Sequence, residues 1–417
     1  MIPLQRIRDD PDSIREGARL KGEGAPIDEI LELDSNARRL RTEVETLRAE
    51  QKRASAEIRG APSEEQRATL GEVKQRIQSG ETELAVLDGQ VEQLLLHVPN
   101  PPHESVPPGG NDSDNVVVRT WGEPAHFDFE PRTHYEIGEA LGIFDFERAT
   151  KLSGSRFAVL RGDGARLQRA LITFFLDVAT TEHGYSEVAP PYLVRRSAMV
   201  GAAQLPKFED DAYKTDDDLF LIPTAEVPVT NLYADEILDG TALPIAHVAY
   251  TPCWRREAGA AGKDTRGYIR LHQFDKVEMV RFTTPERSLE DLELLTGHAE
   301  ALLQRLGIAY RVLLMCSGDM GFAQWKKYDV EAWAPGMQRW LEVSSCSVFG
   351  DFQARRASIR YRAAGGERPQ FVHTLNGSGL AVPRTLDAVL ETFQQADGSV
   401  LVPPVLQPYM GGAQRIG

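Results

Sequence analysis

Long apolar runs are missing from this chain of 417 residues. A helix that crosses a membrane needs about 18 or more consecutive apolar residues. The best candidate, around Leu171 to Ala179, is interrupted by Asp177, so no membrane span is expected. Residues 1–15 mix Arg, Asp and Pro and contain no apolar stretch. We therefore expect no signal peptide and a cytoplasmic protein.

Cysteine and basic charge are also scarce. The three cysteines, Cys253, Cys316 and Cys346, lie far apart in the sequence without CxxC spacing, which argues against a disulfide framework and a zinc site. With 47 Lys and Arg against 62 Asp and Glu, the formal net charge is −15. Any contact with nucleic acid therefore needs a local basic patch. GxGxxG and Walker A sequences are absent, so Rossmann and P-loop chemistry are not expected.

A heptad pattern is present between residues 27 and 98. Apolar residues recur there at alternating spacings of 3 and 4, and residues 59–63, which include Gly60 and Pro62, interrupt the pattern. Two such seams joined by a short breaker predict an antiparallel helical hairpin. With about 30 residues in each helix, the hairpin would extend roughly 45 Å.

The first helix of this predicted arm is basic on its outer face. The basic residues are Arg38, Arg39, Arg41, Arg48, Lys52 and Arg53. From the residues alone two interpretations stay open, a solvated exterior with ion pairs or a surface that contacts phosphates.

From residue 116 onward the pattern changes. Residues 101–115, rich in Pro, Gly, Asn and Asp, predict a linker between an N-terminal domain (residues 1–100) and a second domain (residues 116–417). Strands are predicted at 156–160, 219–222, 247–251, 268–272, 276–282, 310–316, 329–333, 340–349 and 358–362, and helices at 165–183, 288–306 and 380–394. Strands and helices without βαβ alternation favour an α+β domain with an antiparallel sheet.

The segment from Thr251 to Glu278 carries the most chemistry. It is predicted as strand, glycine-bearing loop and strand, and its cations are Arg255, Arg256, Lys263, Arg266 and Arg270. Alternate residues of a strand share a face, which would place Arg270, His272, Phe274, Lys276 and Glu278 together. An arginine for phosphate, an aromatic plane for a base and an acid for an amine suit a nucleotide pocket. The alternative is a polar hairpin at the edge of a sheet.

This segment resembles motif 2 of class II aminoacyl-tRNA synthetases, in the form found in the seryl-tRNA synthetase family. Other stretches agree with the resemblance, which spans almost the whole chain. They are Ser153-Gly-Ser-Arg-Phe157, Gly184-Tyr-Ser-Glu-Val-Ala-Pro-Pro191 (motif 1), Gln204-Leu-Pro-Lys-Phe208, Thr224-Ala-Glu226, Leu341-Glu-Val-Ser-Ser345, and His373-Thr-Leu-Asn-Gly-Ser-Gly-Leu380 with Val382-Pro-Arg-Thr-Leu386 (motif 3).

The resemblance implies an antiparallel class II catalytic domain with an N-terminal helical arm that binds tRNA. It implies ligation of L-serine to tRNA(Ser) through seryl-adenylate, with tRNA(Sec) as a further acceptor, and a homodimer. Arg255 and Arg384 are the expected catalytic residues. The expected ATP-binding residues are Arg255, Arg256, Glu257, Arg270, Phe274, Glu342, Val343, Ser344, Ser345 and Arg384, with Glu342 and Ser345 as Mg²⁺ ligands.

The residues expected to bind serine are Thr224, Ala225, Glu226, Glu278, Asn376 and Ser378. Glu226 would pair with the ammonium group and Glu278 would accept from the hydroxyl. Two alternatives remain beside this interpretation. One is a paralogue that activates an amino acid and loads another acceptor, and the other is a non-catalytic relative that binds RNA. The arm argues against the first. Against the second argue the retained residues Arg255, Glu257, Glu342 and Arg384.

Overall fold

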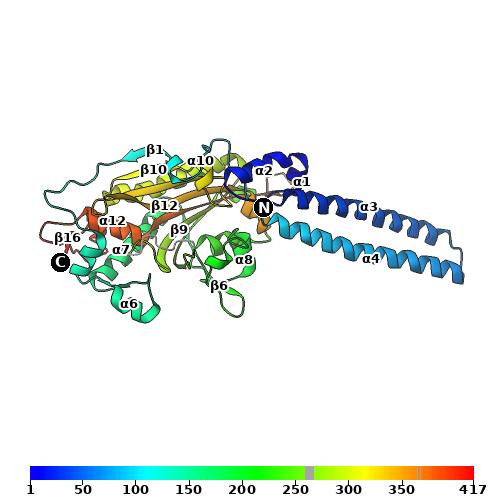
Figure 1. The fold of residues 1–417 in the computed structure, drawn as a ribbon, viewed down its shortest axis with the longest axis horizontal. Coiled ribbons are helices and arrows are strands. Elements are labelled where there is room, and N and C mark those ends of the chain that lie inside the picture. The colour runs from blue at the N-terminus through cyan, green and yellow to red at the C-terminus, as the bar shows by residue number, and fades with distance from the viewer. Residues whose placement is uncertain (259–266, 364, 367) are drawn as a thin grey trace. The chain divides into compact units, whose positions relative to one another are not determined.

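The computed structural model describes residues 1–258, 267–363, 365–366 and 368–417 (Figure 1). The chain divides into two compact units, Met1–Pro101 and Pro102–Gly417. All three cysteines are buried and free. In the part of the chain that the structure describes, no helix combines the length and the apolar character needed to cross a bilayer.

The first unit is helical. Its elements are α1 (Leu4–Asp9), α2 (Pro11–Leu20), α3 (Ile27–Glu57) and α4 (Glu64–Leu95). Helices α3 and α4 run side by side as a hairpin (Figure 1), so the predicted hairpin is confirmed. The turn between them falls at the predicted breaker. Ser63 closes it with a capping box, in which its hydroxyl accepts from Gln66 N–H and the Gln66 side chain accepts from Ser63 N–H.

The predicted seam forms the interface between α3 and α4. Ile30, Val44 and Leu47 of α3 and Ile77 of α4 are buried. Gly80 also lies on the seam, and a Cβ atom placed there would be 2.6 Å from Val44 Cγ2. Glycine is therefore needed at this position because the two helices approach too closely for a side chain.

The second unit is built around an eight-stranded sheet. Its strand order is β1 (Val116–Trp121), β10 (Tyr310–Leu314), β11 (Lys326–Ala334), β12 (Arg339–Gly350), β15 (His373–Ala381), β9 (Gln273–Thr283), β8 (Ile245–Trp254) and β4 (Ser186–Glu187). Every neighbouring pair is antiparallel except β4 and β8. The predicted antiparallel α+β fold is confirmed.

The helices of this unit are α5 (His134–Ala140), α6 (Phe146–Ser153), α7 (Asp163–Thr181), α8 (Arg196–Gly201), α9 (Glu226–Thr230), α10 (Ser288–Leu306), α11 (Phe352–Arg356) and α12 (Val382–Thr392). The short strands are β2 (Phe144–Asp145), β3 (Val159–Leu160), β5 (Leu193–Arg195), β6 (Leu219–Leu221), β7 (Ile237–Asp239), β13 (Arg360–Arg362), β14 (Gln370–Phe371), β16 (Val400–Leu401) and β17 (Arg415–Ile416).

The main core lies between one face of the large sheet and helices α7, α10 and α12. Leu375 of β15 and Val277 and Met279 of β9 point into this core. Side chains alternate between the two faces of a strand. The residues between them, including Lys276, Glu278 and Ser378, therefore point to the opposite face, where they line a cavity.

One predicted strand is wrong. Residues 268–272 form bends instead, and β9 begins only at Gln273. Two backbone groups of this segment bond to side chains: Tyr268 N–H donates to His134, and the Ile269 carbonyl accepts from Arg384. Because a strand needs those groups for its ladder, no strand forms here.

Candidate active site

A cavity of about 430 Å³ opens on the sheet face opposite the main core. Strands β9, β11, β12 and β15 contribute lining residues, and α12 begins at its edge. It brings together predicted site residues from four separate stretches of the sequence. The predicted site residues that line it are Thr224, Glu226, Arg255, Glu257, Arg270, Phe274, Glu278, Glu342, Val343, Ser344, Ser345, Asn376, Ser378 and Arg384.

One end of the cavity is organised around the Glu278 carboxylate on β9. It is 2.6 Å from Lys276 Nζ and accepts from Asn376 Nδ2 at 3.1 Å and from Ser378 Oγ at 3.3 Å. The sheet register explains the contacts, because Ser378 of β15 lies directly opposite Glu278. Lys276 also donates to Thr224 Oγ1 at 2.8 Å. A buried acid is thus held in place by three donors.

A second acid, Glu226, lies at the start of α9 and is buried. Gln353 Nε2 donates to its Oε1 at 2.5 Å, and Thr374 Oγ1 fixes the Gln353 amide by donating to the Gln353 oxygen at 2.6 Å. Burial, aided by the nearby Glu278 charge, raises the pKa of Glu226 to about 7. Two carboxyl groups beside each other create a site that favours a cation such as an ammonium group.

The Arg255 guanidinium group and the Phe274 ring lie next to each other in the cavity. Arg255 follows the end of β8, and its guanidinium carbon lies 5.1 Å from the centroid of the Phe274 ring. Arg270 Nη1 donates to Glu257 Oε2 at 2.5 Å. Glu257 has a positive φ of 54°, an unusual backbone conformation for a residue other than glycine. The site therefore offers fixed positive charge beside a flat ring.

Arg384 connects motif 3 to strand β12. It stands in the first turn of α12, and its Nη1 donates to the Glu342 carbonyl at 2.8 Å and to Glu342 Oε2 at 3.3 Å. Burial alone would raise the pKa of Glu342, but the charges of Arg384, Lys327 and Arg255 outweigh it and lower the pKa. Glu342 is therefore ionised at neutral pH.

A β-bulge sets the direction of Ser345. In the register of β11 with β12, Val330 pairs with Ser344 and Glu331 pairs with Glu342, so Val343 is an extra residue. An extra residue reverses the alternation of side chains beyond it. Glu342 and Ser345 consequently point to the same face, and both line the cavity. Their hard oxygen atoms fit the ligand preference of Mg²⁺.

Some expected residues lie elsewhere. Ala225 is buried beside Glu226 but does not line the cavity. Arg256 also lies outside the lining, because its guanidinium group packs over Tyr213, 4.9 Å from the ring centroid, and donates to the Ala212 carbonyl. Lys263 and Arg266 lie outside the described residues.

Three polar residues that contribute to the site were not assigned from the sequence. Lys276 was placed on the correct face but given no role. Lys327 lines the cavity and lies 3.0 Å from Asp329 Oδ2, and two opposite charges at alternate positions of a strand could have indicated it. Gln353 gave no signal, because its contact with Glu226 depends entirely on tertiary structure.

The basic residues of α3 fall into two groups. Arg41 and Arg48 pair with Asp88 and Glu81 of α4, and Arg38 pairs with Asp34 of its own helix. The remaining three are exposed and have no ion-pair partner among the described residues; they are Arg39, Lys52 and Arg53. The arm thus has ion pairs between its two helices and, beside them, exposed cations without an ion-pair partner among the described residues.

The chemistry of the cavity follows from these contacts. Arginines at two sides can hold phosphate oxygens, and ionised Glu342 can hold a cation between them. Glu226 and Glu278 can hold an ammonium and a hydroxyl group at the other end. Arg255, Arg384 and Glu342 all line this one cavity, so the convergence expected from the sequence is observed.

The sheet and the cavity are those of a class II aminoacyl-tRNA synthetase. A family model described as the tRNA synthetase class II core domain (G, H, P, S and T) matches residues 207–393. A second, described as the seryl-tRNA synthetase N-terminal domain, matches residues 1–102. The first match covers most of the cavity lining, and the second covers the helical hairpin.

Similar proteins agree along the full length. The serine–tRNA ligase of Thermomicrobium roseum is 56% identical, over 100% of this chain and 95% of its own. That of Clostridium tetani is 51% identical over 100% of both. The crystal structure of seryl-tRNA synthetase from Pyrococcus horikoshii complexed with ATP matches with a TM-score of 0.95 at 40% identity, covering 100% of this chain and 99% of that one. The chain belongs to the seryl-tRNA synthetase family.

Proposed function

We propose that this chain ligates L-serine to tRNA(Ser) with ATP, through a seryl-adenylate formed in the cavity. The observation that carries the proposal is the convergence of Arg255, Arg384 and Glu342 in the cavity that also holds Glu226 and Glu278. The names of the relatives support the acceptor and the amino acid. ATP and AMP bound in two similar structures, from Pyrococcus horikoshii and Naegleria fowleri, support the nucleotide.

In the first step a serine carboxylate oxygen attacks the α-phosphorus of ATP, and the bond to the β-phosphate breaks to release pyrophosphate. Negative charge builds on the phosphoryl oxygens, so fixed cations stabilise the transition state. Arg255, held over Phe274, would contact the α-phosphate and the serine carboxylate. Arg384 would contact the γ-phosphate, and Phe274 and Glu257 would contact the adenine side.

Serine would bind at the acidic end. Glu226 would pair with the ammonium group, and Glu278 would accept from the hydroxyl group. Lys276, Asn376 and Ser378 already hold Glu278 in place. An amino acid without the hydroxyl would leave a buried carboxylate oxygen short of a donor, which is costly. The site should therefore select against alanine.

Mg²⁺ would be held by Glu342 and Ser345, whose side chains share a face because of the bulge at Val343. When bound, it would neutralise charge on the phosphates. Among the described residues, no cluster of three or more His, Cys, Asp or Glu side chains is arranged to hold a metal. Mg²⁺ commonly binds through one or two protein oxygens together with substrate phosphates, and Glu342 and Ser345 would supply the protein oxygens.

In the second step a hydroxyl of the 3′-terminal adenosine of tRNA attacks the serine carbonyl carbon, and AMP leaves. The exposed cations of α3, Arg39, Lys52 and Arg53, would contact tRNA phosphates. The division into a tRNA-binding domain (residues 1–100), a linker (101–115) and a catalytic domain (116–417) belongs to the same proposal. So do a homodimer and a cytoplasmic location, and tRNA(Sec) is proposed as a second acceptor.

Two measurements test the proposal. The first is exchange of pyrophosphate into ATP with each of the twenty amino acids, in which serine alone should support rapid exchange. The second is charging of total tRNA, in which serine should appear on tRNA(Ser). Exchange without tRNA charging would favour the paralogue that loads another acceptor. Absence of any exchange would favour the non-catalytic relative.

A shortened chain tests the role of the arm. Deleting residues 36–93 should leave serine-dependent exchange intact and abolish charging, because the cavity residues all lie beyond this range. Unchanged charging by the shortened chain would exclude a role for the arm in tRNA binding.

A further inference from the structure

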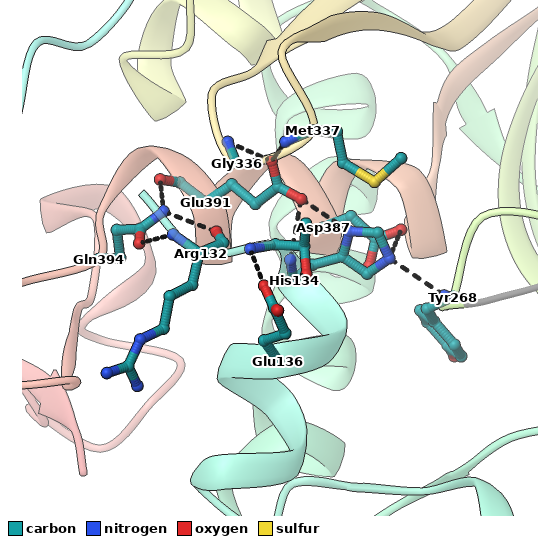
Figure 2. Close-up of polar contacts among 10 residues, drawn as sticks. Arg132, His134, Glu136, Tyr268, Gly336, Met337, Asp387, Glu391 and Gln394 are labelled. Carbon is teal, nitrogen blue, oxygen red and sulfur yellow. Dashed lines mark hydrogen bonds and ion pairs between the residues drawn. The ribbon is translucent and has the colours of Figure 1, made fainter. Parts of the chain in front are cut away.

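A buried cluster of titratable side chains lies outside the cavity, between α5 and α12. His134 stands at the start of α5, and Asp387 and Glu391 stand one turn apart on α12 (Figure 2). All three are fully buried, and none lines the cavity. Burying three titratable groups costs free energy unless hydrogen bonds compensate for the lost water.

Glu391 fixes the ring of His134. Its Oε1 accepts from the backbone N–H of His134 at 2.8 Å and lies 2.7 Å from His134 Nδ1. Its Oε2 accepts from the N–H groups of Gly336 and Met337, at 2.8 Å and 3.0 Å (Figure 2). Both Glu391 oxygens already accept from backbone N–H groups, so we assign His134 Nδ1 as the donor in its contact with Oε1.

The other ring nitrogen acts as an acceptor. The N–H group of Tyr268 donates to His134 Nε2 at 3.3 Å, which requires a lone pair on that nitrogen. Asp387 Oδ2 lies 3.7 Å from Nε2, and neither Asp387 oxygen has a hydrogen-bond partner in the described structure. Burial raises the pKa of Asp387 to about 7. Burial alone would lower the pKa of His134, but the charges of Asp387 and Glu391 outweigh it and raise that pKa, so the bond from Tyr268 N–H belongs to the neutral ring, which prevails above that pKa.

The bond to Tyr268 positions a wall of the cavity. A Cβ atom added to Gly267 would lie 2.3 Å from His134 Nε2, so the backbone rests directly on the imidazole ring. The Tyr268 hydroxyl donates to Gln168 at 2.6 Å and anchors the side chain. The next residues, Ile269 and Arg270, line the cavity, and the Ile269 carbonyl accepts from Arg384 Nε.

We propose that His134, oriented by Glu391, is a positioning residue that fixes the segment 267–271 through the bond from Tyr268 N–H to Nε2. This segment positions Arg270 and the Ile269 carbonyl, which accepts from Arg384. Substitution of His134 should therefore weaken the binding of ATP and not that of serine. The inference rests on the proposed function only in assigning this wall to ATP.

Two substitutions of His134 separate its two nitrogens. An asparagine amide can reach the place of Nδ1 and keep the bond to Glu391, but it cannot reach Tyr268. A glutamine amide can reach the place of Nε2 and offer its oxygen to Tyr268 N–H. In serine-dependent pyrophosphate exchange by the full chain, His134→Asn should raise KM for ATP roughly tenfold, the value of one hydrogen bond. KM for serine should change less than about twofold, and His134→Gln should restore most of the ATP affinity.

Amide hydrogen exchange at Tyr268 provides a readout that does not depend on activity. Its N–H should be protected in the unaltered chain and in His134→Gln, and should lose protection in His134→Asn. His126→Asn is the matched control, because His126 is exposed and outside the cluster. It should leave both KM values and Tyr268 protection unchanged.

Gly267→Ala tests the same contact from the other side. Both the added Cβ and the positive φ of 84° at Gly267 should push the backbone off the ring and raise KM for ATP with His134 intact, so the test remains available if the His134 variants fold poorly. Equal KM values for ATP in His134→Asn and His134→Gln, or parallel increases in KM for serine, would overturn the inference. A lack of serine-dependent exchange in the unaltered chain would instead overturn the proposed function, and Tyr268 protection would still decide this inference.

Discussion

Lys276 Nζ lies 2.6 Å from Glu278 Oε2 on the same face of strand β9. Both side chains are buried, and the lysine also donates to Thr224 Oγ1. Removing one member of an enclosed pair leaves the other without a partner, which is costly, but both members of this pair line the cavity, so water can reach the one that remains. We therefore interpret Lys276 as a residue that orients Glu278, the proposed acceptor for the serine hydroxyl, and not as a source of stability.

We expect Glu278→Ala to lose serine activation much more than folding. The variant loses the proposed acceptor for the serine hydroxyl, a hydrogen bond to a charged group, so kcat/KM for serine should fall about 100-fold or more. The midpoint of thermal unfolding should fall by only a few degrees, because the cavity can admit water to Lys276. Near-normal pyrophosphate exchange would exclude the assignment of Glu278. Glu123→Ala, at an exposed position, is the matched control.

Serine activation should depend on the ionisation of Glu226. Burial and the Glu278 charge raise the pKa of Glu226 to about 7, and the ionised form is the one that pairs with an ammonium group. In the free enzyme, kcat/KM for serine should therefore fall as the pH drops through about 7. Gln353 donates to Glu226 and opposes the increase, so Gln353→Leu should move the midpoint to higher pH. An identical profile in Gln353→Leu would contradict this assignment.

Ionisation of Glu226 should lower the stability of the fold, whereas it should raise serine activation. A carboxyl group whose pKa is raised in the folded state contributes stability at low pH and loses it as the pH rises towards the folded pKa. The change from 4.5 to about 7 corresponds to about 3 kcal/mol at most. Glu226→Gln should therefore be more stable than the unaltered chain at pH 8 and not at pH 4, as measured by denaturant unfolding. Equal differences at both pH values would argue against a raised pKa.

Gly80 should be essential to the arm. Its Cβ position lies 2.6 Å from Val44 Cγ2, so Gly80→Val should force α3 and α4 apart. Overpacking of this kind costs roughly 1–3 kcal/mol, and amide hydrogen exchange in α3 and α4 should become faster. Gly89→Ala on the same helix is the matched control, because nothing lies within 4 Å of its Cβ position. It should stabilise α4 slightly through higher helix propensity.

The unpaired cations of α3 should account for the salt dependence of tRNA binding. Arg39→Gln with Lys52→Gln should weaken tRNA binding and reduce the slope of log affinity against log salt, by somewhat under one unit for each phosphate that the variant no longer neutralises. Arg48→Gln, which removes a residue paired with Glu81, should have a smaller effect. A larger effect from Arg48 than from the two unpaired residues would place the tRNA surface elsewhere.

Two features were evident in the sequence because they repeat or cluster locally. The heptad spacing determined the helical hairpin and the position of its turn, since one helix packing on another demands that periodicity. The alternation of β9 correctly placed Phe274, Lys276 and Glu278 on one face, because the strand begins at Gln273. The same alternation failed at Tyr268, where side chains of α5 and α12 satisfy the backbone.

Only the tertiary structure decided how the site is supported. Gln353 orients Glu226 from a distance of 127 positions along the chain, and the bulge at Val343 turns Ser345 to the face of Glu342. His134 meets Glu391 across 257 positions. Periodicity reports which face of an element is buried, but it does not report which elements meet. Hydrogen bonds between distant segments depend on which elements meet, and the packing of the core determines this.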